Sequence, residues 1–449
     1  MNFAEAGNKM KKIRSAIVIL GASGDLAKRK LIPALSVLRE KQLISGDSVI
    51  IGEGRSEFTD EAFRERFSIC CEFREQLYYH RGIKGLKKYI DGHGAFERII
   101  VFLALPPSSY ASTVEQLYDD GFRKEVNIVI EKPFGRDYRS AHELNESIHK
   151  FFDESQIFRS DHYLAKEAVQ NILIFRFANS IFESSWNSNY VESIQINAFE
   201  KIGVEERGRY FDQSGSIRDM VQNHLLQMLC LITMDPPVSL DPEDIRNQKI
   251  NIIKALEVEE VCRGQYQGYL DEKDIEAGSE TETWAELKLR INNHRWAGTP
   301  IYVRTGKALN RKGTEIGLRF KKRPHALYNP PDGTAPNEII FKVQPSEGIV
   351  LQLTGKNPGM QLQLSRTDMA FCYSESFESE IPEAYQKLLL DALNGDKTLF
   401  VSAAETELAW KKLDGLQSEC GLIHYKRGKV PESSFGDIWI DFEKYADIC

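Results

Sequence analysis

The pattern of hydrophobic and polar positions divides the chain into two parts, and the first third is a series of short apolar runs that end in loops. Ile17–Leu20 runs into GASGDLAKRKLIPAL, Arg98–Leu105 ends in ALPPS, and Val126–Ile130 is followed by EKPFG. A further run, Ser48–Ile51, ends in GEGRS. A strand, a loop rich in glycine or proline and then a helix is the pattern of a parallel sheet with a ligand crevice at its strand ends. The pattern predicts an α/β domain over residues 1–160.

After Phe182 the hydrophobic positions follow a different period. In VESIQINAFE, Ile194, Ile196 and Ala198 alternate with polar residues, and AELKLRI alternates in the same way. This is the pattern of a strand with one buried face. Similar runs follow at Ile301–Arg304, Ile316–Phe320, Ile339–Val343 and Ile349–Leu353. Many such strands with few helices between them predict a mainly antiparallel sheet, and therefore a larger α+β domain over residues 161–449.

The first apolar run leads into a candidate dinucleotide site. Gly21 and Gly24 allow a tight turn and a close approach of the backbone to a pyrophosphate, whose charge would rest on the N-terminus of the helix. Ala27 stands where a third glycine is common, and its small side chain still permits close helix packing. A G-x-x-G-x-x-A match alone is equally typical of a plain glycine turn. Together with the other strand-loop-helix units, it predicts a dinucleotide-binding Rossmann domain.

Two charged residues after the second run bear on the choice of coenzyme. Arg55 stands where the adenosine ribose would lie, and an arginine there can clamp a 2′-phosphate, which favours NADP over NAD. The alternative is a solvated surface arginine. Glu53 could instead accept a hydrogen bond from a free ribose 2′-hydroxyl, which keeps NAD open.

The densest group of polar side chains lies in RSDHYLAKEAVQN, residues 159–171. Asp161, His162, Tyr163 and Lys166 stand where an extended segment is predicted to turn into a helix. His162 and Lys166 are four positions apart, which places them on one face of that helix. Two cation-capable donors and a phenol suit a phosphate dianion, because hydrogen bonds to a charged acceptor are about twice as strong as neutral ones. Asp161 is left for another role.

One helix interrupts the strands of the second part. SIRDMVQNHLLQMLCLITM carries an apolar stripe at helical spacing, formed by Ile217, Met220, Val221, Met228, Leu229 and Ile232. His224 and Asp219 lie off that stripe. A lone helical histidine is more often a structural residue than a base. The acid Asp161 and the upstream dinucleotide site favour a base.

Three further polar side chains stand next to strand ends. Lys132 precedes Pro133, which restricts the backbone of Lys132 away from the helical region. Lys307 follows a strand in RTGKAL, and Gln344 ends one in VQPSEG. Each could contact a ligand or take part in ordinary loop structure.

Composition narrows the class of protein. The 449 residues are 42% hydrophobic and 28% charged, with 58 basic against 66 acidic residues and a net charge of -8. This balance, without a long run of either sign, argues against a partner that is a nucleic acid or a membrane surface. The seven cysteines show no zinc-ligand spacing, and no apolar run could span a bilayer. We expect reduced thiols, no bound metal and a cytoplasmic protein.

Taken together, the motifs resemble those of one enzyme family. The glucose-6-phosphate dehydrogenases have the same order and spacing of motifs, here from about Ile17 to Trp410, as GASGDLAKRKLIPAL, IIGEGRS, EKPFGRD, RSDHYLAKEAVQNIL, GRYFDQSGSIRDMVQNHLLQ, TPIYVRTGKAL and VQPSEG. The resemblance implies oxidation of D-glucose 6-phosphate to 6-phospho-D-glucono-1,5-lactone by hydride transfer to NADP, the first step of the oxidative pentose phosphate pathway. It also implies self-association as a dimer or tetramer built on the large sheet.

The resemblance also assigns roles to individual residues. It implies that His224 is the catalytic base and that Asp161 forms a dyad with it. His162, Tyr163 and Lys166 are expected to bind the phosphate. The full set of implied substrate contacts is Lys132, His162, Tyr163, Lys166, Glu200, Asp219, Lys307 and Gln344. The implied coenzyme contacts are Gly21, Ser23, Gly24, Asp25, Leu26, Lys30, Arg55, Leu105, Pro106 and Lys132.

The chain departs from the family pattern at a few positions. Ser160 stands where isoleucine is usual, Ala165 replaces the glycine of DHYLGK, and Ser216 occupies a commonly apolar position. These departures keep open a related hexose 6-phosphate, such as an amino sugar phosphate, as the substrate. The regions that hold a second, structural NADP in long members also differ, with Gly313 and Gly317 in one of them, so we predict that this second site is absent. A non-catalytic binding protein that kept the fold is the third hypothesis, and the intact set of polar residues argues against it.

Overall fold

The computed structural model describes residues 13–322, 336–376, 380–416 and 421–449, and the chain divides into two compact units. The first unit contains the residues up to Ala165 together with Asp241–Arg246 and Pro382–Glu407. The second contains Lys166–Leu240, Asn247–Ile381 and Leu408–Cys449. The first unit is therefore assembled from three separate stretches of sequence.

The first unit contains the predicted Rossmann fold. Its seven-stranded sheet has the order β15-β6-β5-β4-β1-β2-β3, and all neighbours are parallel except β15, which runs antiparallel to β6. The strands are β1 Ser15–Leu20, β2 Val49–Gly54, β3 Leu77–Arg81, β4 Arg98–Leu103, β5 Val126–Ile130, β6 Ile157–Ser160 and β15 Phe400–Val401. The α-helices are α1 Ile32–Glu40, α2 Asp60–Arg64, α3 Cys71–Glu75, α4 Leu86–Gly92, α5 Tyr110–Asp119, α6 Tyr138–His149, α13 Ala384–Asn394 and the start of α14 Ala403–Leu413, and Ala27–Leu31 is a π-helix.

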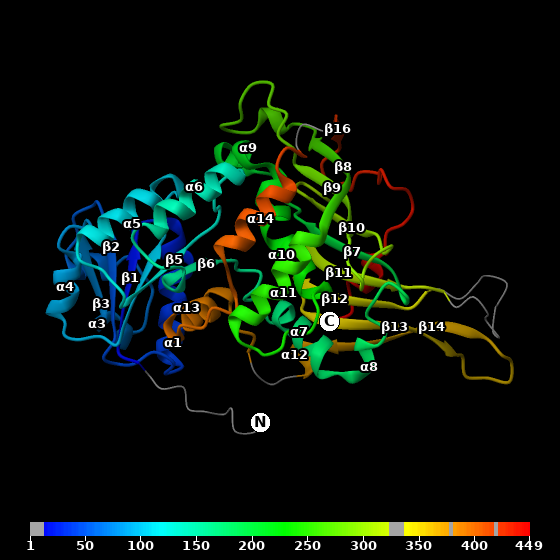
Figure 1. The fold of residues 1–449 in the computed structure, drawn as a ribbon, viewed down its shortest axis with the longest axis horizontal. Helices are drawn as coiled ribbons and strands as arrows, with labels where there is room; N and C mark the ends of the chain where they lie inside the picture. Colours follow the sequence, from blue (N-terminus) through cyan, green and yellow to red (C-terminus); the bar gives the residue numbers. More distant parts are fainter. Residues whose placement is uncertain (1–12, 323–335, 377–379, 417–420) are drawn as a thin grey trace. The chain divides into compact units, whose positions relative to one another are not determined.

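The centre of this sheet explains its apolar sequence. Every residue of β1, SAIVIL, is buried, because helices cover both faces of the sheet. Figure 1 shows α5 and α6 along one side of the sheet and α1 and α13 along the other. The strand order reverses between β1 and β4, and the crevice at the carboxyl ends of these two strands is where a doubly wound sheet binds its ligand.

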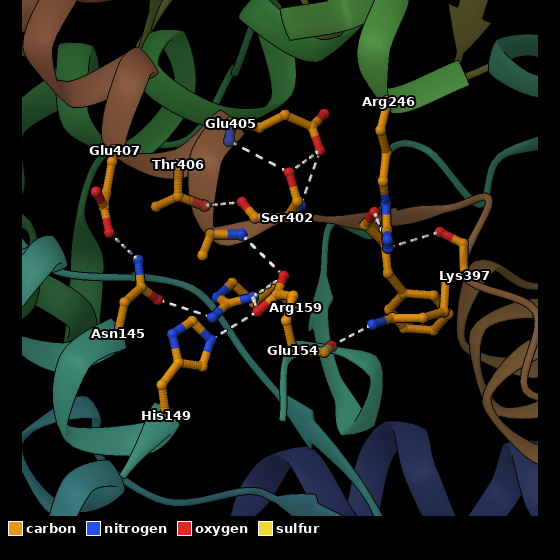
Figure 2. Close-up of polar contacts among 12 residues, drawn as sticks. Asn145, His149, Glu154, Arg159, Arg246, Lys397, Ser402, Glu405, Thr406 and Glu407 are labelled. Atoms are coloured by element: carbon orange, nitrogen blue, oxygen red, sulfur yellow. Dashed lines mark hydrogen bonds and ion pairs between the residues drawn. The ribbon is translucent and has the colours of Figure 1, made fainter. Parts of the chain in front are cut away.

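A buried polar cluster fastens Pro382–Glu407 to the rest of the first unit (Figure 2). Arg159 is only 1% exposed, and its Nη1 donates to both carboxylate oxygens of Glu154 at 2.8 and 2.9 Å. Its Nη2 donates to Asn145 Oδ1 at 2.8 Å, and Asn145 donates to Glu407 Oε1 at 2.8 Å. Strand β6 is thus linked through side chains to the segment that adds β15 beside it.

The carboxylate of Glu154 is strongly stabilised in its charged form. Burial alone would raise the pKa of Glu154, but hydrogen bonds from His149 and the backbone N–H of Ala403, together with the charge of Arg159, lower it to about 2. The Ala403 N–H opens α14, so Glu154 also lies at a helix N-terminus, where a negative charge is favourable. The cluster therefore supports the end of β6 and the beginning of α14 at the same time.

Two more groups of contacts hold the same segment. Ser402 and Glu405 form a capping box: Glu405 Oε2 accepts from Ser402 N at 2.8 Å, and Ser402 Oγ accepts from Glu405 N at 3.3 Å. The guanidinium of Arg246 donates to the carbonyls of Lys397 and Phe400, each at 3.2 Å (Figure 2). These contacts explain why Asp241–Arg246 and Pro382–Glu407 belong to one compact unit.

The second unit contains the predicted large sheet. Its nine strands have the order β14-β13-β12-β11-β7-β10-β9-β8-β16, and only the β7/β10 and β8/β16 pairs are parallel. The strands are β7 Val191–Phe199, β8 Leu256–Tyr266, β9 Trp284–Ile291, β10 Ile301–Gly306, β11 Gly313–Phe320, β12 Glu338–Gln344, β13 Gly348–Lys356, β14 Leu364–Cys372 and β16 Leu422–Tyr425. The prediction of a mainly antiparallel α+β domain is confirmed.

The helices of the second unit include a long π-helix in the segment that carries His224. The α-helices are α7 Glu167–Ala178, α8 Ser180–Glu183, α9 Gly208–Ser216, α10 Leu226–Thr233, α11 Pro242–Ala255 and α12 Tyr373–Ser376, and the π-helix is Ile217–Leu225. The short 3₁₀ helices in the described residues of both units are Pro107–Ser109, Glu154–Gln156, Glu205–Arg207, Tyr269–Asp271 and Phe442–Tyr445. Within the described parts of the chain, none of the helices combines the length and the apolar character needed to cross a bilayer.

The C-terminal segment of the second unit is tied to the large sheet. Cys372, the last residue of β14, forms a disulfide with Cys449 over a Cα–Cα distance of 5.2 Å. Lys342, 4% exposed, donates to the backbone carbonyls of Tyr445 at 2.8 Å and Ala446 at 3.0 Å. The prediction that all cysteines are reduced is therefore wrong for one pair. The fold brings together two cysteines that are 77 residues apart, and sequence spacing carries no sign of that pairing.

Candidate functional site

The glycine turn after β1 has the geometry that the sequence predicts. Gly21 has φ +81°, and a Cβ placed there would lie 2.4 Å from the carbonyl oxygen of Ala104, so no side chain fits. Gly24 N donates to Gly21 O at 2.9 Å and closes the turn. Ala27 is fully buried at the start of the π-helix. The turn runs directly into a helix N-terminus, which is a backbone arrangement that favours a phosphate group.

The other predicted coenzyme residues surround this turn. Ser23 and Asp25 are exposed, and Asp25 is paired with Arg29 at 2.7 Å. Leu105 lies directly beside Gly21, because its Cδ2 would be 3.0 Å from a Cβ built on that glycine. Lys30 forms an ion pair with Glu383, which lies in the segment Pro382–Glu407.

The end of β2 separates the two charged residues that bear on coenzyme choice. Glu53 is 6% exposed, and burial raises its pKa, although a backbone hydrogen bond from Gly21 and the charge of Arg55 act against this rise. Arg55 itself is exposed. On the neighbouring strand β3, Arg81 lies next to it and donates through Nε to the carbonyl of Arg55 at 3.3 Å. The exposed cation is therefore better placed than the buried acid to meet a ribose substituent, and Arg81 is a second cation that the sequence pattern did not reveal.

The segment after β6 folds as a turn and not as the predicted helix. Asp161 is 2% exposed, and its Oδ1 accepts from Tyr163 N at 2.9 Å, while its carbonyl accepts from Leu164 N at 3.0 Å. Helix α7 begins only at Glu167. The prediction that His162 and Lys166 share a helical face is wrong, because the side chain of Asp161 takes the backbone N–H of the next turn and so competes with a helix.

The three departures from the family pattern, two in this segment and one in α9, are buried. Ser160 is 1% exposed, and its hydroxyl donates to Ile130 O at 3.2 Å. Ala165 is also 1% exposed. Ser216 is 2% exposed and lies at the end of α9. All three changed residues are therefore shielded from solvent.

Residues from Pro382–Glu407 lie beside predicted site residues of the first unit. The ring of Tyr385 stacks on that of His162, with centroids 6.4 Å apart and an interplanar angle of 7°. Glu383, two residues earlier, pairs with Lys30. The sequence analysis missed both residues, because they follow His162 by more than 200 positions and carry no motif of their own.

In the second unit, one turn holds the start of α7. Lys166 Nζ donates to Gln344 Oε1 at 2.9 Å, so these two predicted substrate residues do meet. Glu347 Oε2 accepts from Ala168 N at 2.8 Å, at the N-terminus of α7. Burial raises the pKa of Glu347, while this hydrogen bond and the nearby charge of Lys166 oppose the rise. Lys166 therefore comes from a helix start that is fixed by the Gln344–Glu347 turn.

A second pair of predicted substrate residues also meets in this unit. Lys307, just after β10, forms an ion pair with Glu200, just after β7. The two strands are parallel neighbours, so their carboxyl ends deliver both side chains to one place. Lys307 Nζ also lies 5.0 Å from the centre of the Phe211 ring.

The π-helix places Asp219 and His224 on one side. Hydrogen bonds in a π-helix join residues five apart, so residues 219 and 224 lie one turn apart, which an α-helix would not allow. His224 is 1% exposed and Asp219 is 8% exposed. Asp219 Oδ1 accepts from the hydroxyl of Tyr210 at 3.3 Å, and burial raises the pKa of this tyrosine, as does the charge of Asp219.

Comparison with known proteins gives the class of the chain. Residues 18–171 match the model of the glucose-6-phosphate dehydrogenase NAD binding domain, and residues 173–437 match that of the C-terminal domain of the same enzymes. A Rossmann domain followed by a domain with a large mixed sheet defines a dinucleotide-dependent dehydrogenase of two domains. The chain belongs to the glucose-6-phosphate dehydrogenase family.

Individual relatives agree with this assignment. The chain is 39% identical to glucose-6-phosphate 1-dehydrogenase of Aggregatibacter actinomycetemcomitans, covering 90% of each chain, and 37% identical to the chloroplastic enzyme of Spinacia oleracea, covering 90% of this chain and 78% of the relative. A glucose-6-phosphate dehydrogenase solved in complex with glucose 6-phosphate is 34% identical, with a TM-score of 0.89 over 94% of this chain and 96% of that chain. The enzyme from Mycobacterium avium is 30% identical, with a TM-score of 0.84 over 93% and 95%.

Proposed function

We propose that this chain oxidises the C1 hydroxyl of D-glucose 6-phosphate to 6-phospho-D-glucono-1,5-lactone with NADP as hydride acceptor. The observation that carries the proposal is the match, over both units, to a 34% identical dehydrogenase solved with glucose 6-phosphate. The reaction is the first step of the oxidative pentose phosphate pathway.

The residues near β1 and β2 fit an NADP molecule. Gly21 lets the turn after β1 pass close to the backbone of Ala104, and the exposed guanidinium of Arg55 can form paired hydrogen bonds with a 2′-phosphate. Ser23, Gly24, Asp25, Leu26, Lys30, Leu105, Pro106 and Lys132 complete the proposed coenzyme contacts. When bound, NADP supplies the nicotinamide carbon that accepts the hydride.

His224 is proposed as the general base. Loss of a hydride from C1 requires loss of the hydroxyl proton, and an imidazole, with a reference pKa of about 6.5, can take this proton near neutral pH. Asp161 is proposed to orient the ring and to stabilise the imidazolium that forms, as the acid of a catalytic triad does.

The remaining polar side chains are proposed to hold the sugar phosphate. His162, Tyr163 and Lys166 would bind the phosphate, and Glu200 and Asp219 would accept hydrogen bonds from sugar hydroxyls. Lys132, Lys307 and Gln344 complete the set of proposed substrate contacts.

A panel of substrates and coenzymes tests the proposed function. Purified protein is assayed for nicotinamide reduction with glucose, mannose, galactose and glucosamine 6-phosphates, each with NADP and with NAD. We expect the highest kcat/KM for glucose 6-phosphate with NADP. A higher value for glucosamine 6-phosphate would assign the chain to an amino sugar phosphate, and no reduction with any sugar would overturn the proposal.

Lys166→Ala is expected to raise the KM for glucose 6-phosphate by roughly 10–150-fold with a small change in kcat, because a hydrogen bond to a charged group contributes about 1.5–3 kcal/mol. Initial rates across a range of sugar phosphate measure this. Lys201→Ala, which changes an exposed lysine of the same unit, serves as the matched control. A change confined to kcat would remove Lys166 from the phosphate site.

Arg55→Ala is expected to lower kcat/KM for NADP by roughly 10–150-fold while leaving that for NAD nearly unchanged, because only NADP carries the 2′-phosphate. Steady-state rates with both coenzymes measure the ratio. Arg139→Ala, at an arginine whose side chain is 87% exposed on α6, is the control. If the ratio of kcat/KM for NADP to that for NAD is unaltered in Arg55→Ala, another group binds the 2′-phosphate, and the neighbouring Arg81 is the first candidate.

We also propose that the protein acts in the cytoplasm as a homo-oligomer, a dimer or tetramer that associates through the nine-stranded sheet. The β13–β14 region exposes Leu353 by 40%, Leu362 by 60% and Met369 by 58%, and clustered apolar exposure of this kind is typical of an interface. Size-exclusion chromatography with light scattering measures the mass, and a monomer at micromolar concentration would contradict this proposal.

A further inference from the structure

Glu131 is a carboxyl group at the site that the proposed mechanism does not use. It directly follows β5, next to Lys132, at the carboxyl end of the parallel sheet. Strand β5 pairs with β6 in register up to Ile130 and Arg159, so Glu131 lies level with the start of the Ser160–Asp161 turn. Its Oε1 is shut off from solvent and has no hydrogen-bond partner among the described residues.

The polar groups around Glu131 come from three elements of the first unit. The hydroxyl of Tyr385, on α13, donates a hydrogen bond to its carboxyl group, and the hydroxyl of Ser160, at the end of β6, lies beside that group while donating to Ile130 O. The charged groups that act on it are Lys132 and Asp161. Its backbone carbonyl accepts from the hydroxyl of Tyr110 on α5 at 3.0 Å. Contacts from α5 and from α13 therefore hold Glu131 at the end of β5.

Burial of the Glu131 carboxyl group favours its protonated form. Burial raises the pKa of Glu131 to about 7, although the neighbouring hydroxyls of Ser160 and Tyr385 and the charge of Lys132 act to lower it, and the charge of Asp161 adds to the rise. Two carboxyl groups that interact in a dry site lose their protons in sequence.

We propose that Glu131 is a positioning residue of the dehydrogenase, whose buried carboxyl group, held by Tyr385 at the end of β5, adds a second negative charge beside Asp161 and strengthens that aspartate as the partner of the base. This inference rests on the proposed function, because it assigns Asp161 to the dyad. An ionised Glu131 makes the Asp161 carboxylate a better acceptor for the imidazolium that forms during the oxidation. Glu131 itself touches neither the sugar nor the coenzyme in this role.

The consequence is a rise in kcat between about pH 6 and pH 8, as Glu131 loses its proton. In Glu131→Gln the side chain stays neutral at every pH. We expect this variant to match the unaltered enzyme below pH 6 and to be slower by roughly 5–10-fold above pH 8, because a change of one unit in the base's pKa corresponds to about tenfold in its proton affinity. A variant that is slower by the same factor at all pH values would overturn the proposal, since that result indicates a purely structural residue.

Two further variants keep the Glu131 carboxyl group and should shift the pH at which it loses its proton. Ser160→Ala and Tyr385→Phe each remove one hydroxyl that stabilises the ionised form, so the midpoint of the kcat rise should move to higher pH. Tyr385→Phe also keeps the ring that stacks on His162. A midpoint that stays in place or moves to lower pH in both variants would contradict the assignment.

Infrared difference spectra of the protein between pH 6 and pH 8 provide a readout that needs no turnover. The carbonyl stretch of a protonated carboxylic acid should disappear on raising the pH, and it should be missing from Glu131→Gln at both values. If the spectra behave in this way but no sugar phosphate is oxidised, the proposed function fails and the titration of Glu131 stands. If oxidation occurs without this band, the proposal for Glu131 fails alone.

Discussion

His224→Asn is expected to lower kcat for glucose 6-phosphate by roughly 10²–10⁴-fold, the usual contribution of a positioned general base. Asparagine has a similar size and keeps a polar side chain, but it cannot accept the hydroxyl proton at neutral pH. The imidazole is 1% exposed on the π-helix, so bulk water has no direct access to replace it. The KM for the sugar phosphate should stay within about threefold, because the interaction is made in the transition state and not in the ground state.

The matched control for this variant is His424→Asn, which changes an exposed histidine of the same unit on β16. It should behave as the unaltered enzyme. Asp161→Asn should retain part of the activity, because the base remains and loses only its orienting partner. Turnover of His224→Asn at the unaltered rate would show that another group takes the proton, and a large rise in KM with an unaffected kcat would make His224 a binding residue.

Arg159→Leu is expected to destabilise the first unit by about 3 kcal/mol, because it leaves Glu154 and Asn145 without their buried partner. Glu154 keeps its hydrogen bonds to His149 and Ala403 and is 35% exposed, which holds the cost at the lower end of the usual range. For a unit of this size the loss corresponds to a fall in Tm of roughly 6–12 °C. Differential scanning calorimetry measures the shift.

Two companion variants separate the causes. Arg159→Lys keeps the charge but cannot contact Glu154 and Asn145 at once, so it should cost about half as much. Arg159→Leu combined with Glu154→Gln removes the orphaned charge and should recover part of the lost Tm. Hydrogen exchange should place the loosening in Pro382–Glu407, and protection of this segment equal to that of the unaltered protein would contradict the proposed link through the cluster in Figure 2.

The sequence predicts most of the sheets because their strands are uniformly buried or cleanly alternating. The run at Val126–Ile130 has the observed bounds of β5, and the runs around Ile17, Ile194 and Ile349 become β1, β7 and β13. Strands with mixed composition escape this reasoning. Strand β6, IFRS, contains a buried arginine whose charge is neutralised by a side chain outside the strand, and β14 is mostly exposed, so neither shows a regular apolar pattern.

The candidate site is predictable where one local motif determines the geometry, as at Gly21. The geometry of the site is not predictable where a competing local interaction or a segment distant in sequence determines it. Asp161 diverts the backbone into a turn ahead of α7, which a period of 3.6 residues cannot show. The π-helix brings Asp219 and His224 to one side only because its repeat is longer than that of an α-helix. Tyr385 reaches His162 through the fold alone.

The first unit is assembled from stretches that are far apart in sequence, and this affects the chain during its synthesis. Strand β6 emerges from the ribosome at Ser160, but β15, which covers its free edge, follows only at Phe400, about 240 residues later. At roughly 5–20 residues per second this delay lasts about 12–48 s, a period in which an unpaired edge invites pairing with other chains. Until Glu407 is synthesised, Asn145 can accept from Arg159 but lacks the acceptor for its own hydrogen bond, so the cluster is incomplete. A chaperone that shields this edge during synthesis would therefore matter more for the yield of folded protein than one that acts after release.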